Sequence, residues 1–96
     1  MQELNNRVVI ITGAAGNLGS TTAAVFGARG ARVVLVDIDQ QRLEEAQKQL
    51  PDGVESTVIE TNLLEQASVD AMAEAVVAKY GTIDIIANIA GGFTMG

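Results

Sequence analysis

Along the chain, short apolar runs typical of strands alternate with segments whose apolar residues recur at helical spacing. This alternation is the strongest constraint on the fold. The clearest helix is the last one, because the apolar residues from Val69 to Tyr80 recur at i, i+3, i+4, i+7, i+8 and i+11, and Gly81 follows them. Runs rich in Val and Ile predict the strands. The predicted strands cover residues 7–12, 32–37, 54–60 and 83–88, and the predicted helices cover residues 17–29, 39–50 and 69–80.

This order of elements, βαβαβαβ, predicts a doubly wound α/β fold with one parallel sheet. Strands joined by helices of this length run parallel, and each crossover is right-handed. The expected strand order is 3-2-1-4, so that the first and fourth strands flank the point where the winding direction reverses. Ligands of such sheets bind in the crevice outside the carboxyl ends of the strands. We therefore look for a site at that edge.

Composition narrows the class of protein further. With 48% hydrophobic and 19% charged residues, the chain is globular rather than disordered. It has no cysteine for disulfides and no histidine, the commonest metal ligand and general base. The net charge of −6 argues against nucleic acid and anionic membrane surfaces as partners. The N-terminus lacks the features of a signal peptide and no apolar run is long enough to span a bilayer, so we expect a cytoplasmic protein.

A glycine-rich segment, TGAAGNLG at positions 12–19, joins the first predicted strand to the first helix. Gly13 would let the chain turn sharply, Gly16 would leave room for a pyrophosphate, and Gly19 would let helix and strand pack closely. The N–H groups from Ala15 to Leu18 and the positive end of the helix dipole would then face the anion. The alternative is that this segment serves packing alone.

An acidic residue at the expected distance supports a nucleotide site. Asp37 ends the second predicted strand, 18 residues after Gly19, where a carboxylate accepts both hydroxyls of an adenosine ribose and repels a 2′-phosphate. Ile38, the next residue, is assigned to the same cofactor site, and no Arg or Lys lies in the glycine segment or directly after Asp37. These features predict a Rossmann-like domain over residues 1–96 that prefers NAD to NADP. The alternative is that Asp37 is merely a polar residue at a strand end.

With these motifs the chain resembles the short-chain dehydrogenase/reductase family over essentially all of its length. The usual cofactor loop of that family, T-G-x-x-x-G-x-G, would place a glycine at position 17. Here Asn17 stands there and Gly16 precedes it, as in the T-G-x-x-G-x-x-G variant. Asn tolerates a left-handed backbone better than most residues, so we expect Asn17 to preserve the shape of the loop.

Two later segments extend the resemblance. Asn62 and Leu63 stand where the family often has Asp-Val, which implies that the Asn62 side chain and the Leu63 N–H contact adenine. A turn or helix-cap role for Asn62 is the alternative. The segment NIAG at positions 88–91 resembles the family's Asn-Asn-Ala-Gly motif, which implies that Asn88, Ala90 and Gly91 lie along the nicotinamide side. A purely structural role for Asn88 is the alternative there.

The family's catalytic residues are the part of the resemblance that the chain lacks. The family uses a Ser, a Tyr and a Lys, the last two spaced Y-x-x-x-K. Tyr80 is the only tyrosine, Asp84 stands four residues after it, and its place on the apolar stripe predicts core packing. We therefore assign no catalytic residue.

The resemblance implies the NAD(H)-binding half of a longer dehydrogenase that transfers hydride between nicotinamide and an alcohol or carbonyl substrate. Members of this family commonly associate, so a homo-oligomer is expected. Two alternatives remain: a non-catalytic dinucleotide-binding module or sensor, and a nonfunctional remnant.

Overall fold

A computed structural model describes residues 4–89 and places seven elements along them. They are β1 (Val8–Thr12), α1 (Asn17–Ala28), β2 (Arg32–Asp37), α2 (Gln40–Lys48), β3 (Ser56–Glu60), α3 (Gln66–Tyr80) and β4 (Ile85–Asn88). The strands pair in parallel in the order β3-β2-β1-β4. The predicted doubly wound α/β fold and its strand order are therefore confirmed.

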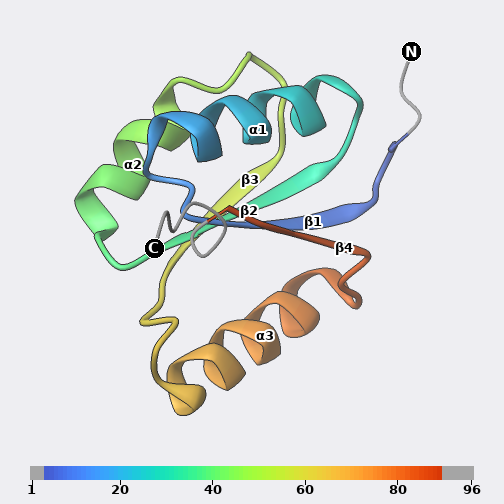
Figure 1. The fold of residues 1–96 in the computed structure, drawn as a ribbon. Helices are drawn as coiled ribbons and strands as arrows, with labels where there is room; N and C mark the ends of the chain where they lie inside the picture. Colours follow the sequence, from blue (N-terminus) through green and yellow to red (C-terminus); the bar gives the residue numbers. More distant parts are fainter. Residues whose placement is uncertain (1–3, 90–96) are drawn as a thin grey trace.

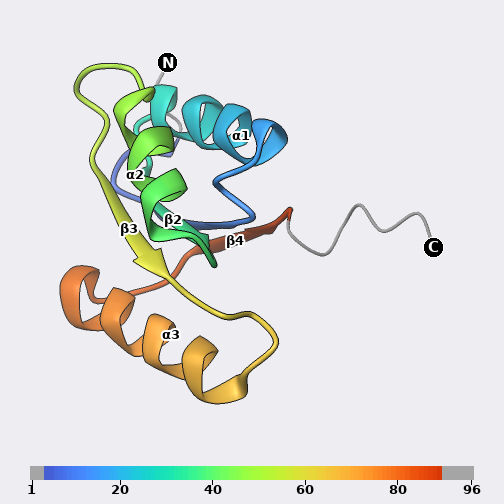
Figure 2. The same cartoon turned by 90° about the vertical axis from the view of Figure 1, so that its left-hand side faces the viewer.

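Helices lie on both faces of the sheet, α1 and α2 on one and α3 on the other (Figures 1 and 2). Alternate residues of a strand point to opposite faces, so each central strand contributes to two cores. Ile11 and Leu35 belong to the core beneath α1 and α2, whereas Ile10 and Val34 pack with Met72 on the α3 side. Burial on both faces explains why these strands are continuous apolar runs. Of the helices described, none is long and apolar enough to cross a membrane.

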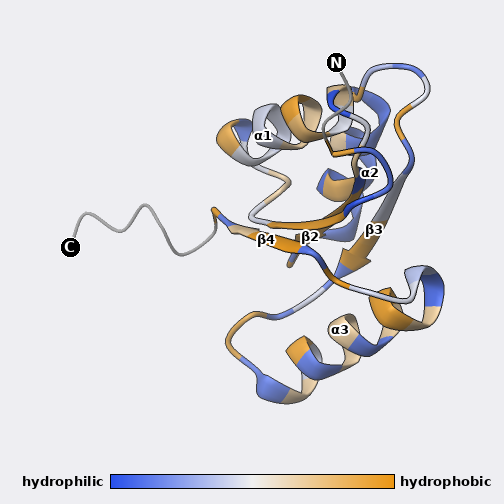
Figure 3. Cartoon of the chain, turned by 90° about the vertical axis from the view of Figure 1, so that its right-hand side faces the viewer, coloured by the Kyte–Doolittle hydropathy of each residue, from blue (hydrophilic) through white to orange (hydrophobic). Residues whose placement is uncertain are grey.

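The edge strand β4 is covered less completely than the central strands. All five residues of β1 are buried, whereas Ile86 of β4 is 61% exposed. Ile86 pairs with Ile10 in the sheet register, so both side chains point to the α3 side. Figure 3 shows the hydrophobic colouring along β4. The helix α3 therefore protects the centre of the sheet but leaves part of β4 open.

The helix ends follow the predicted signals, with small shifts. Gly81 (φ 86°) ends α3 in the left-handed conformation, and the Asp39 side chain accepts a hydrogen bond from the Arg42 N–H at the start of α2. The prediction for the start of α3 was three residues late, because its first turn carries no apolar stripe. The prediction for the end of α2 ran two residues too far, because Leu50 N–H donates to Gln47 O, three residues back rather than four.

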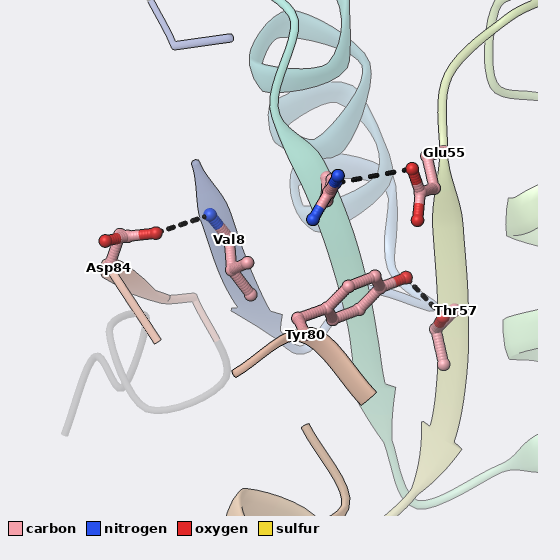
Figure 4. A network of polar contacts seen from close by, with 6 residues as sticks. Val8, Glu55, Thr57, Tyr80 and Asp84 are labelled. Carbon is pink, nitrogen blue, oxygen red and sulfur yellow. Dashed lines mark hydrogen bonds and ion pairs between the residues drawn. The ribbon is translucent and has the colours of Figure 1, made fainter. Parts of the chain in front are cut away.

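Tyr80 packs against the α3-side core, as the helical stripe predicted. Its hydroxyl lies 2.7 Å from Thr57 Oγ1, and the Arg32 guanidinium carbon lies 5.6 Å from the centre of its ring. Figure 4 shows this side chain directed at Thr57.

Asp84 links the segment before β4 to the start of β1. Its carboxylate accepts a hydrogen bond from the Val8 N–H at 2.8 Å (Figure 4).

We expect Val76→Ala to lower the free energy of unfolding by about 2 kcal/mol, because Val76 is 1% exposed and its truncation leaves a cavity against the sheet. The neighbouring Val77→Ala is the matched control. Val77 is 47% exposed, so its truncation should cost less than about 0.5 kcal/mol. Urea unfolding followed by circular dichroism measures both values. Equal losses in the two variants would contradict the assignment of the buried face of α3.

Candidate functional site

The carboxyl ends of the parallel strands bring most of the predicted site residues to one edge of the sheet. Thr12 pairs with both Val36 and Asn88 in the register, and Asp37 pairs with Glu60. The glycine segment, Asp37–Ile38, Asn62–Leu63 and Asn88 therefore follow or end neighbouring strands at this edge. Ala90 and Gly91, also predicted there, lie outside the described residues.

The glycine segment turns sharply and packs closely, and its three glycines have different roles. Gly13 has φ 72°, a left-handed turn that favours glycine. A Cβ on Gly19 would lie 2.1 Å from the Gly13 carbonyl oxygen and 2.8 Å from Ala14 Cα, so only glycine fits there. A Cβ on Gly16 would meet only that same oxygen, at 3.6 Å, which is ordinary contact. Space beside Gly16 is thus left open by the fold.

The first turn of α1 faces outward without a side-chain cap. Gly16 is the N-cap residue, and no side-chain cap accepts a hydrogen bond from the first N–H groups of this helix within the described part of the chain. The first-turn amides of Asn17, Leu18 and Gly19 have no partner within the helix, because an α-helix leaves its first N–H groups unpaired. These donors and the helix dipole favour a bound anion.

Asn17 corrects one expectation from the sequence. It is the first residue of α1, and Asn6 is the one non-glycine residue with positive φ among residues 4–89. Asn17 therefore has a helical backbone and does not use the left-handed conformation that an Asn side chain tolerates. The loop keeps its shape because the left-handed turn is made at Gly13 and the helix starts at position 17.

Asp37 ties the glycine segment to the end of β2. One carboxylate oxygen accepts the Ala15 N–H at 3.0 Å, and the other accepts the Ile38 N–H at 2.7 Å. The Ala15 amide, predicted to face the pyrophosphate, is thus engaged with Asp37 in this structure. Each carboxylate oxygen can accept more than one hydrogen bond, so the same group retains capacity for hydroxyls of a ligand.

Exposed apolar side chains gather at the same edge. Of the seven large hydrophobic side chains exposed in the described chain, four follow β1, β2 or β3, namely Leu18, Ile38, Leu63 and Leu64. Exposed apolar surface of this kind is common where a protein binds a flat or apolar ligand group. Leu18, Ile38 and Leu63 were all predicted to belong to the cofactor site.

Two predicted polar residues make bonds within the fold. The Asn62 side-chain oxygen accepts the Leu64 N–H at 3.0 Å, which is the turn role left open from the sequence. The Asn88 side-chain oxygen accepts the Thr12 hydroxyl at 2.7 Å and so links β4 to β1. The structural alternatives for Asn62 and Asn88 are therefore present, and their contacts with a cofactor stay predictions.

Arg42 is a residue at this edge that the sequence analysis missed. It lies in the first turn of α2, and its Nη2 is 3.4 Å from the Ala15 carbonyl oxygen. The predicted helix start at Asp39 was the available signal, because it places Arg42 one turn from the end of β2. Arg42 lies outside the two places where a basic residue was expected, the glycine segment and the position after Asp37.

A cavity of about 410 Å³ lies at the opposite edge, where residues such as Asn6, Gly30 and Glu55 precede the strands. Helix C-termini, which carry the negative end of the dipole, meet that edge, so it is unsuited to a phosphate. The open helix N-terminus and the apolar side chains both favour the carboxyl edge instead. Among residues 4–89, no three His, Cys, Asp or Glu side chains cluster in a way that could hold a metal ion.

Comparison with known proteins agrees with this geometry. Residues 7–96 match the family model described as short chain dehydrogenase. The chain therefore belongs to the short-chain dehydrogenase family.

Galactitol 2-dehydrogenase of Agrobacterium fabrum is 37% identical over 92 residues, which are 96% of this chain and 35% of that protein. A 3-ketoacyl-(acyl-carrier-protein) reductase from Brucella melitensis, complexed with NADH, has TM-score 0.79 and 33% identity over 88% of this chain and 34% of its own. A metagenomic short-chain oxidoreductase in complex with NADP has TM-score 0.81 and 29% identity over 85% and 38% of the two chains. The chain spans about a third of the length of these proteins.

We expect Gly19→Ala to lower the free energy of unfolding by roughly 2–4 kcal/mol, because the new methyl group would collide with backbone atoms that cannot rotate away. Gly16→Ala is the control. Position 16 has φ −85° and open space, so the change should be less than about 1 kcal/mol. Thermal unfolding of both variants beside the natural protein measures the difference. Similar stabilities for the two variants would show that α1 can move away from the loop.

Proposed function

We propose that this chain is the NAD(H)-binding part of a short-chain dehydrogenase/reductase that transfers hydride between nicotinamide and an alcohol or carbonyl substrate. One observation carries the proposal: the open N-terminus of α1 lies beside the Asp37 carboxylate, to which the Ala15 amide is bonded at 3.0 Å. A dinucleotide requires N–H groups that donate hydrogen bonds to its pyrophosphate and a carboxylate that accepts hydrogen bonds from its ribose, both at the same edge of the sheet.

The start of α1 suits the pyrophosphate both sterically and electrostatically. The amides of Asn17, Leu18 and Gly19 would donate to the pyrophosphate, and the missing side chain at Gly16 leaves the approach open. No acidic residue lies in the first turn of α1 to repel the anion, within the residues described. The protein contributes binding and orientation here, while the nicotinamide ring supplies the hydride chemistry.

The nucleoside sides of the site follow from the neighbouring strand ends. Asp37 would accept the adenosine ribose hydroxyls. The exposed Ile38 and Leu63 would contact the adenine ring, with Asn62 as a polar neighbour. On the other side of the reversal point, Asn88 would hold β4 in place for the nicotinamide half, to which we also assign Ala90 and Gly91.

We further propose that the site prefers NAD to NADP. The similar solved structures include a complex with NADH and one with NADP, so family membership leaves the choice open. Asp37 favours NAD because its carboxylate would repel a 2′-phosphate at the place where it accepts ribose hydroxyls. We also propose that residues 1–96 act as one nucleotide-binding domain of a cytoplasmic homo-oligomer, on the strength of the family resemblance and the absence of cysteine.

Asp37→Ala should weaken NADH binding by at least about tenfold, because two hydrogen bonds from ribose hydroxyls to a carboxylate are lost. NADPH binding should weaken less, since the substitution also removes repulsion of the 2′-phosphate. Fluorescence titration of the variant and of the natural protein, both full-length, measures the dissociation constants of NADH and NADPH. Asp52→Ala, which removes an exposed carboxylate at the opposite edge, is the matched control and should change neither.

An unchanged NADH/NADPH preference in Asp37→Ala would refute the role of this carboxylate in choosing the cofactor. A folded natural protein that binds neither dinucleotide at millimolar concentration would refute the proposed function as a whole. Binding without hydride transfer, either from an alcohol to NAD or from NADH to a carbonyl compound, would instead favour the non-catalytic dinucleotide sensor.

A further inference from the structure

The cavity of about 410 Å³ at the edge of the sheet where the strands begin has walls from three separate segments. They are the turn before β1, the end of α1 and the segment between α2 and β3 (Figure 1). The last two pack closely, because a Cβ on Gly27 would lie 2.7 Å from Val54 Cγ1. This contact fixes one wall of the cavity in place.

Asn6 contributes a side-chain amide to this cavity from a left-handed backbone. Its φ is 66°, and its backbone N–H donates to the Gly30 carbonyl oxygen at 3.0 Å, which holds the turn against the end of α1. Glycine adopts such a conformation more readily than asparagine, so the turn itself does not require a side chain at position 6. The Asn6 amide is exposed and lines the cavity, where it is available to a ligand.

Arg32 and Glu55 form a loose ion pair in the wall of the cavity. Arg32 Nε lies 3.4 Å from Glu55 Oε1 (Figure 4), but this nitrogen is buried and makes no hydrogen bond with any described residue. The two side chains are 34% and 54% exposed. A guanidinium has several N–H donors and a carboxylate has two acceptor oxygens. Both groups therefore keep the capacity to bind a ligand.

The charges around the cavity disfavour an ionic ligand. Asp52 and Glu55 line it and α1 ends there with the negative end of its dipole, so an anion would be repelled. The Arg32 guanidinium would repel a cation. A ligand hydroxyl, in contrast, both donates and accepts hydrogen bonds. Hydroxyl groups therefore match a wall that offers N–H donors beside carboxylate and amide oxygens.

We propose that this cavity is a binding site for a small uncharged polyol, whose adjacent hydroxyls contact Asn6 and the Arg32–Glu55 pair. The planar fork of Arg32 would donate to neighbouring hydroxyl oxygens, and Glu55 would accept from one of the hydroxyls. Pro51 and Val54 supply apolar surface for the carbon atoms. The cavity and the dinucleotide site lie at opposite edges of the sheet, so this inference does not rest on the proposed function.

The test titrates the full-length natural protein with three five-carbon probes, and saturation-transfer NMR of each probe measures its binding. The probes are ribitol, 1,5-pentanediol and 1,5-diaminopentane. Ribitol should bind saturably. The second probe lacks adjacent hydroxyls and the third is a dication, so each should bind at least about tenfold more weakly than ribitol.

Two variants locate the bound ribitol. Asn6→Gly removes the amide and keeps the left-handed turn, whereas Arg32→Lys keeps the charge and loses the planar fork. Each should raise the dissociation constant of ribitol at least about threefold. Arg7→Lys is the matched control and should leave this constant unchanged, because Arg7 pairs with Asp84 at 3.6 Å and is not part of the cavity lining.

A ribitol affinity that stays within about twofold of the natural value in either cavity variant overturns the proposal. Absence of ribitol binding at high millimolar concentration overturns it as well, as does equal or tighter binding of either other probe. NADH binding is measured on the same samples, and its absence from the natural protein would refute the proposed function while leaving the polyol site standing. Circular dichroism confirms that each variant is folded.

Discussion

The close approach of α1 to the turn after β1 is the constraint on which the candidate site depends. A Cβ at Gly19 would lie 2.1 Å from the Gly13 carbonyl oxygen, so the helix can start where it does only because position 19 has no side chain. This contact brings the unpaired amides of the first turn to the carboxyl end of the sheet. The bond between Ala15 and Asp37 then joins the same turn to β2.

Several polar groups at this edge serve the fold and remain available to a ligand. Asp37 and Asn88 each accept a hydrogen bond from a distant part of the chain, and Asn62 accepts one within its own turn. Such bonds hold a side chain in one orientation before a ligand arrives, which lowers the entropy lost on binding. A carboxylate or amide oxygen with a second lone pair can still accept a ligand hydroxyl. Structural and binding roles are therefore compatible at these positions.

Sequence periodicity predicted every strand and helix and the order of the sheet, because both faces of β1 and β2 are buried and their apolar runs are unbroken. The element ends were less predictable. The fourth strand begins at Ile85 rather than at position 83, and the third begins at Ser56 rather than at position 54. Strand ends are defined by hydrogen bonds to a neighbouring strand, and an apolar pattern does not record where those bonds begin.

By itself the sequence determined the local chemistry of this protein: where the chain can turn, where a helix begins with free amides, and which acidic residue ends β2. These properties depend on neighbours within a few residues. Only the tertiary structure decided that Asp37 bonds to Ala15, that Asn88 bonds to Thr12, and that Arg42 reaches the glycine segment. Those partners are 22, 76 and 27 residues apart, so their contact depends on how the strands and helices pack.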